Sequence, residues 1–288
     1  MLLEAKPYVE MKIKELKERV EKLETKPKLV IIRVGNDKAS EKYVNNKIKR
    51  CEEVGIESQI IHLREDISQD HVAFEIQKLN NNHWVTGILL QLPLPKHLDE
   101  EYLTNLILPS KDVDGFTTEN MGRLALGMEG NIACTPRGII DLLKFYEIPI
   151  EGENVLIINR SNIVGKPLAH LFLKENATVT IAHSKTRDLR EKMANADIIV
   201  TAIGKANYFD DYDFEPDQTI VDVSINFDEN GKMCGDVDKS KYDEISNDLF
   251  CNLTPVPGGV GACTVIQLLE QTIEIAEKKS NSLRIIYG

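Results

Sequence analysis

Short apolar runs alternate along this chain with longer amphipathic segments. Residues 28–34 form a run of mostly branched apolar side chains, which predicts a strand, whereas residues 40–54 carry apolar side chains at helical spacing and stop at Gly55. Alternation of this kind is typical of parallel sheets covered by helices. The pattern therefore predicts the α/β fold class.

The same pattern locates the other elements. A helix is predicted over residues 68–79 with Ser68 as its N-cap, and another over residues 138–145 with Thr135 as its cap. The last helix is predicted over residues 263–279. Further strands are predicted at residues 58–63, 84–92, 154–159, 177–182, 197–203 and 219–223.

Composition sets limits on function. The chain has 288 residues, 42% of them hydrophobic and 28% charged, which is ordinary for one large or two modest globular domains. Its net charge of -11, without a basic stripe, argues against nucleic acid or an anionic membrane as a partner. The five scattered cysteines form no Cys-x-x-Cys pair, and no apolar leader or spanning run is visible. We therefore expect a cytoplasmic protein with reduced thiols and no metal site.

A nucleotide site is suggested by residues 155–173. They are predicted as strand, turn and helix, the arrangement in which a dinucleotide phosphate meets a helix N-terminus. The Gly-x-Gly-x-x-Gly fingerprint is missing, because Asn159 stands first in the turn and Gly165 comes one place late. On this pattern alone, an ordinary βα turn is as good an interpretation as a Rossmann domain.

Residues 183–187 bear on the choice of cofactor. They follow the second predicted strand of this half, where an enzyme that selects NAD usually has an acid for the ribose 2′-hydroxyl. The sequence there is His-Ser-Lys-Thr-Arg, which offers hydroxyls and positive charge but no acid, and Arg160 could add a planar fork for a 2′-phosphate. We therefore expect NADP, although basic residues in an exposed loop are also commonly just solvated.

Tyr43 and Lys47 stand four residues apart in a predicted helix, so both side chains leave the same face. Taken alone, such a pair is more often solvated surface than a site. Six further motifs accompany it: GILLQLPLP at 87–95, KDVDG at 111–115, CTPRG at 134–138, RSNIVGKP at 160–167, GDVD at 235–238 and TPVPGGVG at 254–261.

In this order the motifs closely resemble those of the bifunctional methylenetetrahydrofolate dehydrogenase/methenyltetrahydrofolate cyclohydrolase family of one-carbon metabolism. The resemblance covers nearly the whole chain. It implies two α/β domains flanking a cleft: a folate-binding catalytic domain at residues 1–118 and a Rossmann-like NADP-binding domain at residues 119–262. The C-terminal helix, residues 263–288, is implied to complete the first domain. The resemblance also implies a homodimer that binds tetrahydrofolate derivatives in the cleft.

The resemblance assigns catalysis to Tyr43, Lys47, Gln91 and Asp114. A pterin needs an aromatic face and a polar acceptor, which Tyr43 and Asp114 offer, although an Asp-Gly pair is most often a plain turn. Oxidation mainly requires alignment, whereas hydrolysis benefits from a base or proton relay, the role implied for Lys47. Gln91 is expected to hold Lys47 or a water molecule; its alternative role is to satisfy backbone groups.

Further binding residues are implied by the resemblance. For the substrate they are Tyr43, Gln91, Asp114, Pro257, Gly258 and Gly259. For the cofactor they are Asn159, Arg160, Ser161, Gly165, Ser184, Ile225 and Thr264. The proline- and glycine-rich loop at residues 254–261 suits close backbone approach to a ligand, and a structural crossover between domains is the alternative.

The chain departs from the family pattern at three places. Asn159 and Ser224 each stand for a glycine, and Ala262-Cys263 stands for Pro-Met. Asparagine tolerates a left-handed backbone, so the turn at Asn159 is expected to survive. Two alternatives to the bifunctional enzyme stay open: a dehydrogenase with weak or absent cyclohydrolase activity, and a catalytically silent folate- or nucleotide-binding protein.

Overall fold

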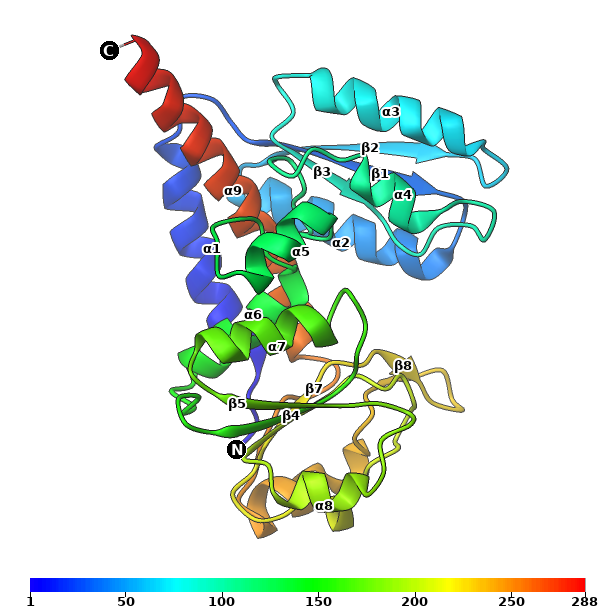
Figure 1. The fold of residues 1–288 in the computed structure, drawn as a ribbon, viewed down its shortest axis with the longest axis vertical. Coiled ribbons are helices and arrows are strands. Elements are labelled where there is room, and N and C mark those ends of the chain that lie inside the picture. Colours follow the sequence, from blue (N-terminus) through cyan, green and yellow to red (C-terminus); the bar gives the residue numbers. More distant parts are fainter. Residues whose placement is uncertain (288) are drawn as a thin grey trace. The chain divides into compact units, whose positions relative to one another are not determined.

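The computed structural model describes residues 1–287, with side chains throughout except at positions 38–40, 42, 244 and 281–287 (Figure 1). The chain forms two compact units, which we name by their parallel sheets. The three-stranded unit contains Met11–Ile132 and Val265–Gly288, and the five-stranded unit contains Met1–Glu10 and Ala133–Thr264. Each unit is described by itself below.

The compact units divide the chain differently from the predicted domains at two flanking segments. Residues 1–10 belong with the five-stranded unit, where the backbone N–H of Leu3 donates to the carbonyl of Leu253 at 2.8 Å. Residues 119–132 belong with the three-stranded unit, where Asn120 Nδ2 donates to Asp112 Oδ2 at 3.0 Å. Long-range bonds of this kind, which no local pattern reveals, decide where the flanking segments pack, and the domain boundary at residue 118 stays a prediction.

The three-stranded sheet has the order β2-β1-β3, and its strands are parallel. β1 (Lys28–Val34) lies between β2 (Glu57–Leu63) and β3 (Gly87–Leu90) and is almost wholly buried, which its unbroken apolar run explains. β3 is shorter than the predicted 84–92. The backbone N–H of Trp84 bonds the side chain of Asn82 at 3.0 Å instead of a neighbouring strand.

Side chains of β1 alternate between the two faces of this sheet. Val30, Ile32 and Val34 pack in one hydrophobic cluster with apolar residues of α3 (Gln69–Asn81). Arg33 points the other way and bonds Glu41 of α2 (Lys38–Val54) at 3.4 Å. Helices α3 and α2 therefore cover opposite faces (Figure 1).

The helices of this unit begin and end close to their sequence signals. The Ser68 hydroxyl accepts from the N–H of His71, as expected of the N-cap of α3. Helix α9 (Val260–Tyr287) is longer than the predicted 263–279, and within this unit its Glu270 pairs with Lys12 of α1 (Ala5–Glu21) at 2.9 Å. The two short helices are α4 (Glu100–Asn105) and α5 (Thr118–Ala125). No helix in the described part of the chain is long and apolar enough to cross a membrane.

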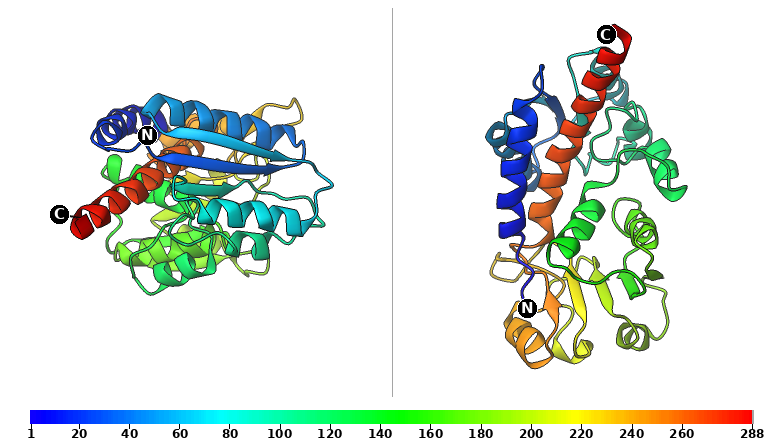
Figure 2. Two further views of the ribbon diagram at one scale, coloured as in Figure 1. Left: turned by 90° about the horizontal axis from the view of Figure 1, so that it is seen from above. Right: turned by 90° about the vertical axis from the view of Figure 1, so that its left-hand side faces the viewer.

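The five-stranded sheet is also parallel and has the order β10-β7-β6-β4-β5. Figure 2 gives two further views of the chain. Its strands are β4 (Asn154–Ile158), β5 (Thr178–Ala182), β6 (Ile198–Thr201), β7 (Thr219–Asp222) and β10 (Asn252–Leu253). Its other elements are α6 (Cys134–Phe145), α7 (Gly165–Lys174), α8 (Leu189–Ala194), the antiparallel pair β8 (Asn226–Phe227) and β9 (Met233–Cys234), and the short helical turns at Asp211–Asp213, Lys239–Lys241 and Glu244–Asp248.

The predicted cap of α6 is wrong. The helix begins at Cys134, with Ala133 at the N-cap and no side-chain cap bond. Thr135 therefore lies inside the first turn, and its hydroxyl is 3.0 Å from that of Thr264.

The strand order of this sheet reverses at β4. Strand β5 lies on one side of β4 and β6 on the other, so the chain runs outward in one direction and then crosses back. In open parallel sheets, ligands bind outside the carboxyl ends of the strands at such a reversal. The carboxyl ends of β4 and β6 are therefore the place to look for a cofactor.

Candidate active site and cofactor-binding residues

Tyr43 and Lys47 lie on the same face of α2, as their spacing predicted. Lys47 Nζ lies 5.4 Å from the centre of the Tyr43 ring. Lys47 is only 5% exposed, whereas Tyr43 is half-buried. Solvated surface, the commoner role of such a pair, is therefore excluded for Lys47.

Gln91 holds the amine of Lys47. It is the first residue after β3, and its backbone N–H donates to the carbonyl of Ile32 at 2.9 Å. Lys47 Nζ donates to Gln91 Oε1 at 3.0 Å, while Gln91 Nε2 donates to the carbonyl of Leu92 at 2.7 Å. The second bond fixes which end of the amide faces the lysine.

Cys51 lies one turn beyond Lys47 on α2 and has no exposed surface. Burial raises the pKa of its thiol to about 12, against the opposing effect of the Lys47 charge. The thiol stays protonated at neutral pH and packs as an apolar side chain. Cys51 is therefore not a second reactive group beside Lys47.

Asp114 follows a short segment that runs parallel to β3. Asp112 of that segment pairs with Ile88, and the Ile88 N–H donates to the carbonyl of Lys111 at 2.8 Å. This pairing carries the half-buried Asp114 toward the carboxyl end of β3, where Gln91 also lies. The structure thus directs the predicted residues to the same end of one sheet.

The turn around Asp114 is built by its neighbour Asp112. Asp112 is 1% exposed; its Oδ1 accepts from the N–H of Gly115 at 2.9 Å and its Oδ2 from that of Thr117 at 2.8 Å. Gly115 has a φ of 68°, which glycine adopts at no steric cost. These turn bonds do not involve Asp114, although a plain turn was its alternative role.

Two side chains that we did not predict support this segment. Lys111 Nζ donates to three carbonyls at the end of α3, each at 2.8 Å, so the lysine of the KDVDG motif caps a helix. Gln271 Nε2 of α9 donates to the carbonyl of Val113 at 2.6 Å. The sequence signal that could have identified Gln271 is its polar side chain within an apolar helix face, where it is only 1% exposed.

Asn159 shapes the turn between β4 and α7 through its side chain. Its Oδ1 accepts from the backbone N–H groups of Ser161 at 2.8 Å and Gly165 at 3.1 Å, and its Nδ2 donates to the carbonyl of Ala202 at 2.7 Å. The turn survives, as expected, but without a left-handed backbone at Asn159, whose φ is not positive. A Cβ at Gly165 would overlap the carbonyl of Asn159, which explains the glycine there.

Arg160 and the Ser184 loop lie at the carboxyl ends of β4 and β5. Arg160 is exposed, and no other residue in the described part of the chain bonds its side chain. The loop after β5 is folded by Thr186, whose hydroxyl accepts from the His183 N–H at 2.8 Å, and this turn leaves Ser184 and Lys185 exposed. Positive side chains therefore face solvent at the sheet edge where a cofactor is expected.

The other departures from the family pattern are accommodated. The Ser224 hydroxyl donates to Asp236 Oδ2 at 2.8 Å, and Ile225 beside it is exposed. Cys263 is fully buried, and burial raises the pKa of its thiol to about 12. Thr264, next in the chain, donates to the carbonyl of Val260 within α9 at 3.3 Å.

The loop before α9 is held on both sides within the five-stranded unit. The backbone N–H of Val256 donates to the hydroxyl of Tyr242 at 3.2 Å, and the carbonyl of Gly258 accepts from the N–H of Ala5 at 2.8 Å. Pro257 and Gly258 are exposed, whereas Gly259 is buried. The loop thus has a fixed inner side and an accessible tip.

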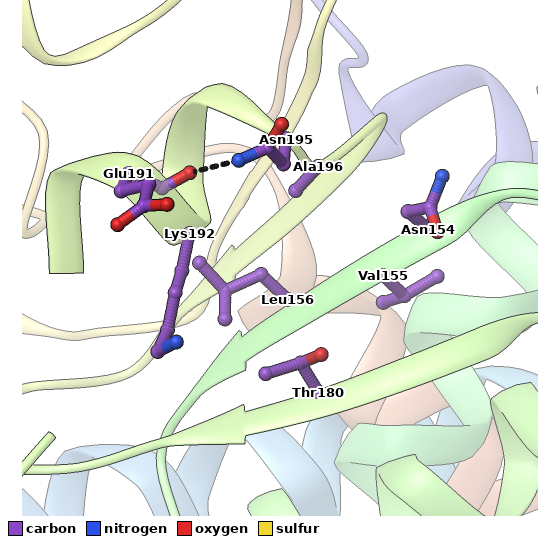
Figure 3. Close-up of a pocket in the computed structure, with 8 residues that line it drawn as sticks. All are labelled: Asn154, Val155, Leu156, Thr180, Glu191, Lys192, Asn195 and Ala196. Carbon is purple, nitrogen blue, oxygen red and sulfur yellow. Dashed lines mark hydrogen bonds between the residues drawn. The ribbon is translucent and has the colours of Figure 1, made fainter. Parts of the chain in front are cut away.

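A pocket of about 260 Å³ in the five-stranded unit is not this site (Figure 3). It lies beside α8, where the Asn195 side chain donates to the Glu191 carbonyl at 2.7 Å. Its lining residues are Asn154, Val155, Leu156, Thr180, Glu191, Lys192, Asn195 and Ala196. None of the predicted site residues is among them, and the β4 residues come from the first part of that strand, away from its carboxyl end. We assign this pocket no function.

Together, a reversing parallel sheet with basic side chains at its carboxyl edge and a second unit with a buried lysine–glutamine pair define an α/β enzyme of the dinucleotide-binding class. Residues 3–114 match the tetrahydrofolate dehydrogenase/cyclohydrolase catalytic domain, and residues 133–280 match the NAD(P)-binding domain of the same enzymes. The chain belongs to the tetrahydrofolate dehydrogenase/cyclohydrolase family. The family implied by the motifs is confirmed.

Individual relatives are similar to this chain along most of its length. The "Bifunctional protein FolD" of Ligilactobacillus salivarius is 46% identical over 88% of this chain and 87% of its own. The crystal structure of the bifunctional FolD enzyme from Campylobacter jejuni is 42% identical with a TM-score of 0.93, covering 97% of this chain and 99% of its own. The Trypanosoma brucei FolD enzyme, solved with NADP and an inhibitor, is 29% identical with a TM-score of 0.90, covering 97% and 98%.

Proposed function

We propose that the protein oxidises 5,10-methylenetetrahydrofolate with NADP to 5,10-methenyltetrahydrofolate and hydrolyses that product to 10-formyltetrahydrofolate. The observation that carries the proposal is the buried amine of Lys47, bonded to Gln91 and beside the Tyr43 ring, in a chain of this family. A protein that only bound folate would need the aromatic ring but not the buried amine.

Lys47 is the proposed proton carrier of the hydrolysis. Water adds to the methenyl carbon and loses a proton, and the tetrahedral carbon then opens to the formyl group as one nitrogen leaves. Lys47 accepts or relays the proton, and Gln91 orients its amine without adding charge. Because Gln91 Nε2 is bound to the Leu92 carbonyl, its oxygen stays turned toward the lysine.

Folate binding is proposed for the polar and aromatic residues at the same sheet end. Tyr43 offers its ring for stacking, and Asp114 offers a carboxylate to the N–H groups of the pterin edge. Gln91 contributes to the same site. The accessible loop tip at Pro257 and Gly258, with the buried Gly259, is the proposed backbone contact for the substrate.

NADP is the proposed cofactor, and the residues at the carboxyl edge fit it. Bound NADP supplies the acceptor for the hydride that leaves the methylene carbon. Arg160 and Ser184 would hold its 2′-phosphate, and residues 183–187, directly after β5, include no acid to favour NAD. The remaining proposed contacts are Asn159, Ser161, Gly165, Ile225 and Thr264.

We also propose a cytoplasmic homodimer. All five cysteines are free and buried, which suits a reducing compartment. The dimer is carried over from the family resemblance, and sedimentation of the purified protein tests it directly. A single species at the mass of one chain would refute it.

Product identification with the unmodified protein tests the proposed function. Methylenetetrahydrofolate is incubated with NADP and, separately, with NAD, and the folate products are resolved. We expect 10-formyltetrahydrofolate with NADP and much less of it with NAD. Accumulation of methenyltetrahydrofolate that hydrolyses no faster with the enzyme than without it would identify a dehydrogenase only. No product despite folate binding would identify a silent binding protein.

A further inference from the structure

Asp236 is a carboxylate that the proposed chemistry does not use. It lies two residues after β9, in the GDVD motif, and has no exposed surface. Its bonds come entirely from neutral donors in the described part of the chain. A buried charge without an ion pair is tolerated only when hydrogen bonds replace its hydration, so the surroundings of Asp236 show what it holds.

Six donors converge on this carboxylate, three on each oxygen. Those on Oδ1 are Gly204 N at 3.0 Å, Lys205 N at 2.9 Å and Asn226 Nδ2 at 3.2 Å. Those on Oδ2 are Ile203 N at 2.7 Å, Thr201 Oγ1 at 2.7 Å and Ser224 Oγ at 2.8 Å.

Three of the donors are consecutive backbone N–H groups, at residues 203–205. Such a run forms a concave anion-binding site of the kind that often takes a phosphate. Here the carboxylate of Asp236 fills it from the buried side. The N–H groups of this loop are therefore committed to Asp236 and do not serve a cofactor phosphate.

The bonded loops follow β6 and β7. The carboxyl end of β6 lies at the reversal of strand order, where a cofactor is expected. The inner sides of these loops contact Asp236, whereas Gly204, Lys205 and Ile225 are exposed on their outer sides. A change at Asp236 would move the surface that the cofactor meets without touching the cofactor.

Ser224 extends this network beyond what a glycine could provide. Its hydroxyl donates to Asp236 and also accepts from the N–H of Gly204 at 3.1 Å, which joins the two loops directly. The substitution of serine for the usual family glycine therefore adds bonds to the network.

We propose that Asp236 is a positioning residue for cofactor binding, which holds the loops after β6 and β7 in the conformation that receives NADP. The inference rests on the proposed function and deepens it. It assigns phosphate binding to Arg160 and the loop at residues 183–187, and denies it to residues 203–205.

Asp236→Asn tests the inference in the full-length protein. The new amide NH2 faces three of the six donors, so the loops must shift. We expect the dissociation constant for NADP, measured by calorimetry, to rise at least tenfold, while kcat/KM for methenyltetrahydrofolate hydrolysis stays within twofold. The matched control is Asp238→Asn, because among the described residues the side chain of Asp238 bonds only the N–H and hydroxyl of Ser240 in its own turn.

Several results would overturn the inference. They are unchanged NADP binding in Asp236→Asn, an equal change in Asp238→Asn, or a matching loss of hydrolysis that shows general damage. If Asp236→Asn does not fold, the double variant Thr201→Val/Ser224→Ala decides, since it removes two donors and keeps the carboxylate. At least threefold weaker NADP binding is then expected, and unchanged binding overturns the inference.

The unmodified protein separates this inference from the proposed function. If it binds NADP but forms no methenyltetrahydrofolate, the proposed reaction fails while the positioning role can still be judged from binding. If it binds no NADP, both fail.

Discussion

In the three-stranded unit, the residues implied for catalysis follow the family pattern, and Lys47 contacts both Tyr43 and Gln91. At the carboxyl edge of the five-stranded sheet the sequence departs from that pattern, and the new side chains of Asn159 and Ser224 bond to neighbouring backbone N–H groups. In the proposed function the side chains of the first arrangement act on the reacting carbon, whereas those of the second fix the shape of the loops. Loop shape survives exchange when the new side chain makes compensating bonds, whereas a proton carrier has no such substitute.

Replacement of Lys47 should have the largest effect. Lys47→Met should slow methenyltetrahydrofolate hydrolysis by about a hundred- to ten-thousand-fold, because the proton transfer loses its carrier. Lys49→Met, at an exposed position of the same helix, is the matched control and should change little. Stopped assays of both reactions check this, and an equal loss of oxidation would refute the separate role of Lys47.

Asp114→Asn should act on both reactions through folate binding. A charged hydrogen bond contributes about 1.5–3 kcal/mol, so the Michaelis constant for folate should rise roughly ten- to a hundred-fold in each assay. Asp112→Asn provides the contrast, since it breaks buried turn bonds and should chiefly lower the melting temperature. An unchanged Michaelis constant in Asp114→Asn would make Asp114 a mere turn residue.

Arg160→Ala should weaken the binding of NADP far more than that of NAD. The loss of one charged hydrogen bond predicts a rise in the Michaelis constant for NADP on the order of ten- to a hundred-fold. Arg160→Lys keeps the charge without the planar fork, so its Michaelis constant for NADP should lie between those of the unmodified protein and Arg160→Ala. The same factor for both cofactors would show that Arg160 serves their shared pyrophosphate or the fold.

Asn159→Gly should change NADP binding in the opposite direction. The Asn159 oxygen occupies the N–H groups of Ser161 and Gly165, which a cofactor phosphate could otherwise use. Freeing these N–H groups should tighten NADP binding a few-fold, which corresponds to about one hydrogen bond. It should also lower the melting temperature, because the hydrogen bonds of the Asn159 side chain are lost. Calorimetry and thermal unfolding test the pair of effects. Weaker NADP binding would show that the asparagine itself holds the cofactor.

Asp222 should make stability depend on pH in the five-stranded unit. Burial raises the pKa of this carboxyl to about 7, with the charge of Asp236 adding to the shift and backbone N–H bonds opposing it. The folded pKa exceeds the unfolded one, so the contribution to stability is full below about pH 4 and is lost as pH rises through about 7.

Asp222→Asn should therefore flatten the pH dependence. The fall in melting temperature between pH 5 and pH 8 should be smaller than in the unmodified protein, by roughly 2–4 °C for each kcal/mol that the titration of Asp222 contributes over this range. Parallel curves for the two proteins would show that Asp222 does not titrate in this range.

The fold was predictable where it depends on local pattern. The strands starting at residues 28 and 154 and the helix capped by Ser68 follow from apolar periodicity and end signals. Strand β10 has two residues and pairs only with β7, so no periodicity marks it. The compact units place residues 1–10 and 119–132 differently from the predicted domains for the same reason, since bonds to distant segments decide where these residues pack.

The candidate site divides in the same way. The i,i+4 spacing sufficed to set Tyr43 beside Lys47, whereas the identity of Gln91 as the lysine's partner came from family resemblance. The turn at Asn159 was expected to survive because asparagine tolerates a left-handed backbone, whereas the side-chain amide of Asn159 is what holds it. The role of Asp236 was out of reach, because its donors come from separate segments of the chain.

A crossed measurement on two variants tests the central claim that chemistry and cofactor choice are separable. The values of kcat/KM for NADP-dependent oxidation and for methenyltetrahydrofolate hydrolysis are measured in Lys47→Met and in Arg160→Ala. The account predicts opposite patterns: Lys47→Met loses hydrolysis and keeps appreciable oxidation, and Arg160→Ala loses oxidation with NADP and keeps hydrolysis. Proportional loss of both reactions in both variants would contradict it.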